Sequence, residues 1–153
     1  MTRDPIFRIA SMSKPVTSVA ALQLIEEGAF ALDDPIADWA HEFTHMRSLR
    51  TPDGPLHESD PAARPITFED LLTHRAGLTY GAFHSGPITA AYADALRGDI
   101  GTEIEPDDWI ARLAGLPLIN QPGSAFRYGA STDLLGLLIA RIERAPLAEV
   151  LQR

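Results

Sequence analysis

The chain has 153 residues, a formal net charge of −8 and no cysteine. This length predicts a single domain over residues 1–153. The negative charge argues against nucleic acid and membranes as partners, and the missing cysteine excludes disulfides and thiolate chemistry. The longest apolar run, Leu134–Ala140, is too short to span a bilayer. Because the N-terminus shows no signal-peptide pattern, we expect a cytoplasmic protein.

The first predicted helix covers Ser11–Glu27 and ends at Gly28, a residue that favours the position just after a helix. Pro15 supports this start, because proline is tolerated only in the first turn, where its missing N–H is not needed. Its apolar residues spread around most of the circumference, which predicts a helix covered on several sides.

Ser11 and Lys14 are three residues apart in this helix, so their side chains share one face. A serine hydroxyl becomes a nucleophile when a base removes its proton, and a desolvated lysine can do so. Ser13 immediately precedes Lys14 and is expected to face elsewhere. The S-x-x-K pattern therefore predicts Ser11 as nucleophile and Lys14 as its activating group, although a helix cap beside a solvated lysine gives the same pattern.

The elements that follow are mainly helical. A small β-hairpin is possible near 46–60, with Asp53-Gly54 at its tip, and an irregular loop is the alternative. Thr67 and Asp70 resemble a capping pair that opens a helix. Further helices are predicted near 88–97 and 107–115, and a long final helix is capped by Ser131 or Thr132 and broken by Pro146.

A second motif competes with S-x-x-K. Residues 41–45 read H-E-x-x-H, which on a helix presents two imidazoles to zinc and a glutamate as base. A catalytic zinc needs a third protein ligand, but Ser48 and Thr51 occupy the positions that the extended motif reserves for glycine and histidine. Glu69 or Glu103 would be the substitute ligand. A zinc metallopeptidase remains the alternative, and we expect surface histidines and no metal.

Four segments carry a family resemblance. They are FRIASMSKPVTSVAALQLIEEG at 7–28, LDDPIADW at 32–39, PITFEDLLTHRAGLTYG at 65–81 and QPGSAFRYGASTDLLGLLIARI at 121–142. In this order they resemble the serine β-lactamase-like family, specifically the class C β-lactamase-type esterases called family VIII carboxylesterases. The resemblance implies the helical lobe of the α+β fold of serine β-lactamases and transpeptidases. We expect His74, within the third segment, to be a hydrogen-bonded structural histidine.

The resemblance also implies a catalytic set. Ser11 is acylated, Lys14 helps to activate it, and Tyr128 completes the proton network. Whether Lys14 or Tyr128 holds the proton stays open. The chain departs from the β-lactamase pattern at Ala130, where Y-x-N would place asparagine, and we therefore expect ester hydrolysis. No K-T-G, H-x-G or W-x-G triplet follows Tyr128, and family members are commonly more than twice as long, so we expect a truncated form of the fold.

Four functions follow as hypotheses. The first is a carboxylesterase that forms an acyl-enzyme on a small-molecule ester, or on a β-lactam-like substrate, and needs no cofactor. The second is a folded fragment with little activity, because the absent strand would carry the second oxyanion donor, whose loss costs about 10²–10³ in rate. The others are a zinc metallopeptidase and a helical interaction module. Because Val16, Val19, Leu22 and Ile25 lie on a helix with too small a lobe to cover them, we also expect a homo-oligomer or a complex with the rest of the fold.

Overall fold

A computed structural model describes residues 7–98 and 103–152. Short 3-10 helices (η) accompany the α-helices. In chain order the elements are η1 (Ala10–Met12), α1 (Ser13–Glu26), η2 (Ile36–Asp38), η3 (His41–Phe43), β1 (Arg47–Leu49), β2 (Ser59–Pro61), α2 (Phe68–Leu72), η4 (Gly81–Phe83), α3 (Pro87–Leu96), α4 (Pro106–Ala114), α5 (Ser131–Glu143) and α6 (Leu147–Val150). The expected mainly α fold, with one small pair of strands, is confirmed.

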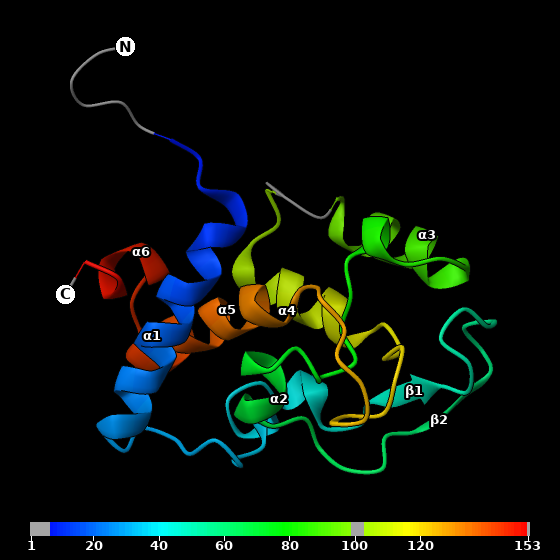
Figure 1. Cartoon of the computed structure of the whole chain (residues 1–153), viewed down its shortest axis with the longest axis horizontal. Helices are drawn as coiled ribbons and strands as arrows, with labels where there is room; N and C mark the ends of the chain where they lie inside the picture. Colours follow the sequence, from blue (N-terminus) through cyan, green and yellow to red (C-terminus); the bar gives the residue numbers. More distant parts are fainter. Residues whose placement is uncertain (1–6, 99–102, 153) are drawn as a thin grey trace.

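Helix α5 is the centre of the fold. It packs against α1, α2, α4 and α6, while α3 packs on α4 (Figure 1). Residues on most sides of α5 are buried: Ser131, Thr132, Leu134, Leu135, Gly136, Leu138 and Ile139. A helix that is apolar nearly all round belongs in a core, so α5 organises the packing that positions the other helices.

The segment that contains Ser11 starts differently from the predicted helix. Ser11 lies in η1, and the α-helical turns begin only at Ser13. The reason is Pro15, which lacks an N–H and whose ring would collide with the carbonyl four residues earlier, that of Ser11. With α1 starting at Ser13, Pro15 occupies the first turn, where no hydrogen bond is required of it.

The far end of α1 follows the prediction. Gly28 has a φ of +77°, the left-handed region that glycine enters without strain. Its N–H donates to Ile25 O at 3.0 Å and the next N–H, of Ala29, donates to Leu24 O at 2.9 Å. This pair of bonds satisfies carbonyls that would otherwise lack partners at the helix end.

Helix α2 begins with the expected cap. The Thr67 side chain accepts a hydrogen bond from Asp70 N at 3.3 Å, and the Asp70 carboxylate accepts one from Thr67 N at 3.0 Å. Asp70 also binds the Arg64 guanidinium at 2.6 Å and 2.8 Å. These bonds anchor the short helix that precedes His74.

Two local expectations need correction. Strands β1 and β2 pair antiparallel, with Ser48 opposite Asp60. The segment that joins them is too long for a two-residue turn. Asp53-Gly54 therefore lies inside a loop and does not form the tight turn of a hairpin. The start of α5 also differs, since Ala130 is its N-cap and makes no side-chain cap. Ser131 and Thr132 lie within its first turn, because both are buried against the core.

No helix among the described residues is long and apolar enough to cross a membrane. The cytoplasmic location and the single-domain organisation stay predictions.

Candidate active site

The structure brings Ser11 and Tyr128 into direct contact. Ser11 lies in η1, just before α1, and Tyr128 lies in the segment that leads into α5. The Tyr128 hydroxyl donates a hydrogen bond to Ser11 Oγ over 2.7 Å, between residues 117 positions apart in the sequence. Both groups are hydroxyls, and each can donate or accept. Tyr128 is therefore placed to exchange a proton with Ser11.

Lys14 lies beside this pair but bonds elsewhere. Its ammonium nitrogen Nζ donates to the Tyr80 hydroxyl at 2.8 Å and to Asp133 Oδ2 at 3.4 Å. The same nitrogen is 5.3 Å from the centroid of the Tyr128 ring. Among the described residues, no hydrogen bond joins Lys14 to Ser11. In this arrangement the Lys14 ammonium lies close to Tyr128 without a hydrogen bond to Ser11.

Tyr80 and Asp133 are site residues that the sequence did not reveal. Tyr80 is nearly buried, at 9% exposure, and its hydroxyl donates to the Asp133 carboxylate while accepting from Lys14. Only their positions in the sequence could have pointed to these two residues. Tyr80 is near the end of the third family-like segment, and Asp133 is in the first turn of the last long helix. No spacing rule connects residues so far apart.

One glycine lets the two tyrosine-bearing segments meet. A Cβ atom added to Gly129 would stand 2.3 Å from Thr79 Cα. Only a residue without a side chain allows this approach of two backbones. Gly129 follows Tyr128 and Thr79 precedes Tyr80, so the contact fixes both phenols relative to each other. Their ring centroids are 6.0 Å apart.

His74 packs against the site as a neutral ring. Its centroid lies 5.1 Å from that of Tyr128, and its Nε2 lies 3.4 Å from the Thr132 hydroxyl. Nδ1 is buried and has no hydrogen-bond partner among the described residues. Burial, and then the nearby Lys14 cation, lower the pKa of His74 below its ordinary value. The expected hydrogen-bonded histidine thus has a partner at only one nitrogen.

A cavity of about 610 Å³ opens over these groups. Ser11, Lys14, Tyr80, Tyr128 and Asp133 all line it. Most of the remaining wall is apolar: Ala10, Ala82, Phe83, Ile104, Pro106, Trp109, Leu137 and Leu147. Polar groups therefore gather beside Ser11, and an apolar surface continues from them, as in many small-molecule sites.

Ser13 also lines this cavity. The cavity is therefore lined by residues of both η1 and the first turn of α1. Among the described residues, no hydrogen bond joins the Ser13 hydroxyl to Lys14 or Tyr128. Contact with Tyr128 thus distinguishes Ser11 from Ser13.

The H-E-x-x-H segment forms a different arrangement. Only residues His41–Phe43 are helical, in η3. Glu42, the base of the zinc hypothesis, binds Arg141 at 2.9 Å, and the side chain of His41 is 91% exposed. Within residues 7–98 and 103–152, no group of three or more possible metal ligands gathers. The geometry offers the zinc alternative no support, and independence from metal stays a prediction.

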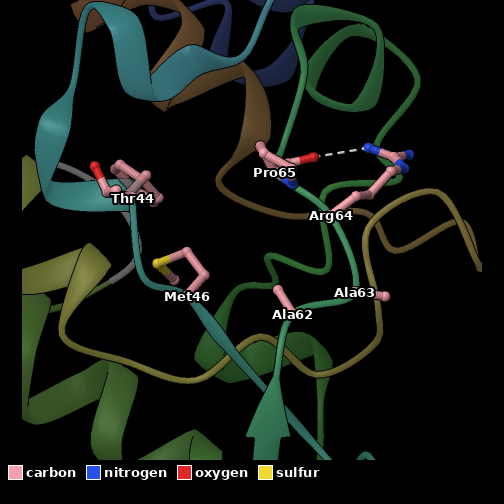
Figure 2. A pocket seen from close by; sticks show the side chains of 7 residues that line it. Thr44, Met46, Ala62, Ala63, Arg64 and Pro65 are labelled. Carbon is pink, nitrogen blue, oxygen red and sulfur yellow. Dashed lines mark hydrogen bonds between the residues drawn. The ribbon is translucent and has the colours of Figure 1, made fainter.

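A second, smaller hollow lies between the loop after η3 and the segment that follows β2 (Figure 2). Thr44, Met46 and Arg64 are among its lining residues. Arg64 donates to the carbonyl of Pro65 at 2.9 Å and also binds Asp70. Its charge is already paired, and none of the residues predicted for catalysis lines this hollow.

Comparison with known proteins identifies the family. The family model described as Beta-lactamase matches residues 1–153, and the chain therefore belongs to the β-lactamase family, as its motifs indicated. Protein Rv1367c of Mycobacterium tuberculosis is 48% identical over 151 residues, which are 99% of this chain and 36% of that protein. Esterase EstB of Burkholderia gladioli is 34% identical over 148 residues, 97% of this chain and 35% of that enzyme.

Solved structures agree with this assignment. The structure of EstCE1, a hydrolase with promiscuous acyltransferase activity, superposes with a TM-score of 0.80 at 30% identity, covering 99% of this chain and 37% of that one. The chain thus spans about a third of the length of the relatives it matches. Its fold is the mainly helical part of the β-lactamase-like fold, in a family of serine hydrolases and acyltransferases.

Proposed function

We propose that this chain carries the nucleophile and proton-transfer groups of a carboxylesterase that acts through an acyl-enzyme on Ser11. The observation that carries the proposal is the 2.7 Å hydrogen bond between the Tyr128 hydroxyl and Ser11 Oγ, beside the Lys14 ammonium. The names of an esterase and of a hydrolase with acyltransferase activity among the relatives support the same chemistry.

The proposed reaction uses Tyr128 as the proton acceptor, in the phenolate form that remains once its own proton has passed to solvent. Ser11 Oγ attacks the ester carbonyl carbon while its proton passes to the phenolate oxygen Tyr128 Oη, which becomes a neutral phenol. The tetrahedral intermediate collapses, the alcohol leaves with the proton from Tyr128, and the acyl group stays on Ser11. Water then attacks the acyl-enzyme by the same route and releases the acid. An acceptor alcohol in place of water would give acyl transfer.

Lys14 has an electrostatic role in this scheme. A phenol must gain negative charge to accept a proton from serine, and a cation about 5 Å away favours that charge. The Ser11 N–H is proposed as one oxyanion donor. A hydrolase normally needs two such donors, and lacking one costs about 10²–10³ in rate. We therefore expect acylation of this chain to be slow.

The test is labelling by a fluorophosphonate, read as intact mass with peptide mapping. We expect one adduct on Ser11, abolished by Ser11→Ala. Ser13→Ala is the control, because Ser13 lines the same cavity without contacting Tyr128, and it should be labelled like the wild type. Labelling that survives Ser11→Ala would overturn the assignment. A folded wild-type chain that takes no label would favour the inactive fragment or the interaction module.

A further inference from the structure

Lys14 is held by two residues outside the Ser11–Tyr128 pair. The Tyr80 hydroxyl accepts from Lys14 Nζ at 2.8 Å and donates to Asp133, while Asp133 Oδ2 lies 3.4 Å from the same nitrogen. Three side chains therefore form a closed triangle of hydrogen bonds. Lys14 and Tyr80 are mostly buried, and the side chain of Asp133 is 46% exposed.

This triangle restrains a side chain that is otherwise free to rotate. A lysine ammonium sits on a flexible four-carbon stem and carries three rotatable donors. Two acceptors on opposite segments fix its position, and it then remains 5.3 Å from the Tyr128 ring. The backbone of each acceptor belongs to a packed segment, since Asp133 is in the first turn of α5 and the segment of Tyr80 packs closely against Gly129 through Thr79.

We propose that Tyr80 and Asp133 are positioning residues for acylation of Ser11, acting by holding the Lys14 ammonium beside Tyr128. The proposal rests on the proposed function of Ser11. Neither residue contacts Ser11 in the structure, and both act through Lys14. Asp133 also balances the Lys14 charge, so that it sets how strongly Lys14 promotes loss of a proton from its neighbours.

Several titratable groups surround Lys14. They are Tyr80 before η4, Tyr128 before α5, Asp133 on α5 and His74 after α2. Acylation requires a proton to leave Ser11 for one of the groups of this site. The position of the ammonium among them therefore decides on which group its charge acts most strongly.

Lys14 is the only lysine in the sequence, so its side chain can be followed alone. In protein labelled with ¹³C-lysine, the relaxation of the Lys14 Cε resonance reports how firmly the side chain is held, without any need for activity. We expect Asp133→Asn and Tyr80→Phe each to make the Lys14 side chain more mobile. Asp94→Asn, an exposed carboxylate on α3, is the control and should change nothing.

The second readout is the rate of fluorophosphonate labelling. In Asp133→Asn and in Tyr80→Phe this rate should fall about 10- to 100-fold, because Lys14 is no longer held in place. The NMR spectra show whether each variant is folded, and Tyr80→Phe supplies the test should Asp133→Asn fail to fold.

The outcomes separate this inference from the proposed function. Labelling that depends on Ser11 but is unchanged in both variants would overturn the positioning roles and leave the proposed function standing. A Lys14 side chain that is held as firmly in both variants as in the wild type would also overturn them. A wild-type protein that is never labelled would overturn the proposed function, and the positioning roles would fall with it.

Discussion

Tyr128 and Lys14 form one proton-transfer unit in the proposed mechanism, although only Tyr128 contacts Ser11. We expect Tyr128→Phe and Lys14→Ala each to lower the labelling rate by about 10²–10⁴-fold, the usual contribution of a general base. The double variant should be little slower than either single one, because groups that act together are not additive. Rates that multiply in the double variant would show that the two residues act independently.

The second prediction for a single residue concerns the close packing of Gly129 against Thr79. Gly129→Ala places a methyl group 2.3 Å from Thr79 Cα, a backbone atom that has no rotamer by which to move away. Overpacking of this kind costs about 1–3 kcal/mol or more. We expect a loss of that size in the free energy of urea unfolding, together with slower labelling of Ser11.

Gly115→Ala is the control for this substitution. Gly115 is exposed, and an added Cβ atom would meet nothing closer than 3.3 Å. Its unfolding free energy should stay close to that of the wild type. Equal stability of the two alanine variants would show that the Thr79–Gly129 contact is looser than the structure indicates.

At the scale of elements, an ion pair joins η3 to α5. Glu42 binds Arg141 at 2.9 Å, and this hydrogen-bonded cation, opposed by burial, holds the pKa of Glu42 below its ordinary value of 4.5. The stabilisation is therefore present above the ordinary pKa and is lost as pH falls through the lowered one. We expect Glu42→Gln to reduce the free energy of unfolding at pH 7 by about 1–2 kcal/mol.

The difference between Glu42→Gln and the wild type should shrink in the acid range below pH 4.5, which unfolding curves at several pH values would measure. Asp107→Asn is the control. Asp107 binds the same Arg141 at 2.8 Å, but its side chain is 83% exposed, and exposed pairs contribute about 0–1 kcal/mol. A difference that stays constant from neutral to acid pH would assign the effect of Glu42→Gln to packing.

The elements also show what the sequence could predict. The α2 cap follows from Thr67 and Asp70 because capping involves neighbours three residues apart. The end of α1 at Gly28 is equally local. The sequence analysis places Ser11 in an α-helix, whereas it lies in the 3-10 turn η1. The position of Pro15 indicates this later start of α1, because proline fits only in the first turn. The hairpin register was not predictable, because strand pairing depends on partners beyond the loop.

Some residues of the candidate site are likewise predictable from the sequence, and others are not. The spacing of Ser11 and Lys14 is local, and Tyr128 came from family resemblance. The hydrogen bonds of Lys14 to Tyr80 and Asp133 join residues 66 and 119 positions apart. No local pattern encodes such contacts, because they result from how α1, η4 and α5 pack in three dimensions.

At the scale of the whole molecule, α1 leaves an apolar face uncovered. Its buried residues Thr17, Ala20, Ala21 and Leu24 recur at helical spacing, and α1 packs on α5. On other sides Val16, Val19 and Leu22 are 47–55% exposed. An exposed apolar stripe of this kind marks an interface.

We therefore expect association of this chain with itself or with the remaining part of a longer β-lactamase-like fold. Covering several such side chains contributes a few kcal/mol, at about 25 cal/mol per Å², against the cost of association. Light scattering at micromolar concentration should show a species larger than a monomer, and Val19→Lys should shift it towards monomer. Leu151→Lys, an exposed apolar residue outside α1, is the control. A well-folded monomer that binds no hydrophobic dye would contradict this prediction.

The 117-residue separation between Ser11 and Tyr128 has a consequence for folding kinetics. Contacts so distant in sequence form only after the intervening chain is ordered, since closing a long loop costs entropy before the contact is gained. Under the proposed function, Ser11 therefore gains its reactivity only once Tyr128 is in place, even in chains whose α1 is already helical. A fluorophosphonate added at successive times during refolding would mark only molecules whose native topology is complete, and the gain in mass would record the last stage of folding.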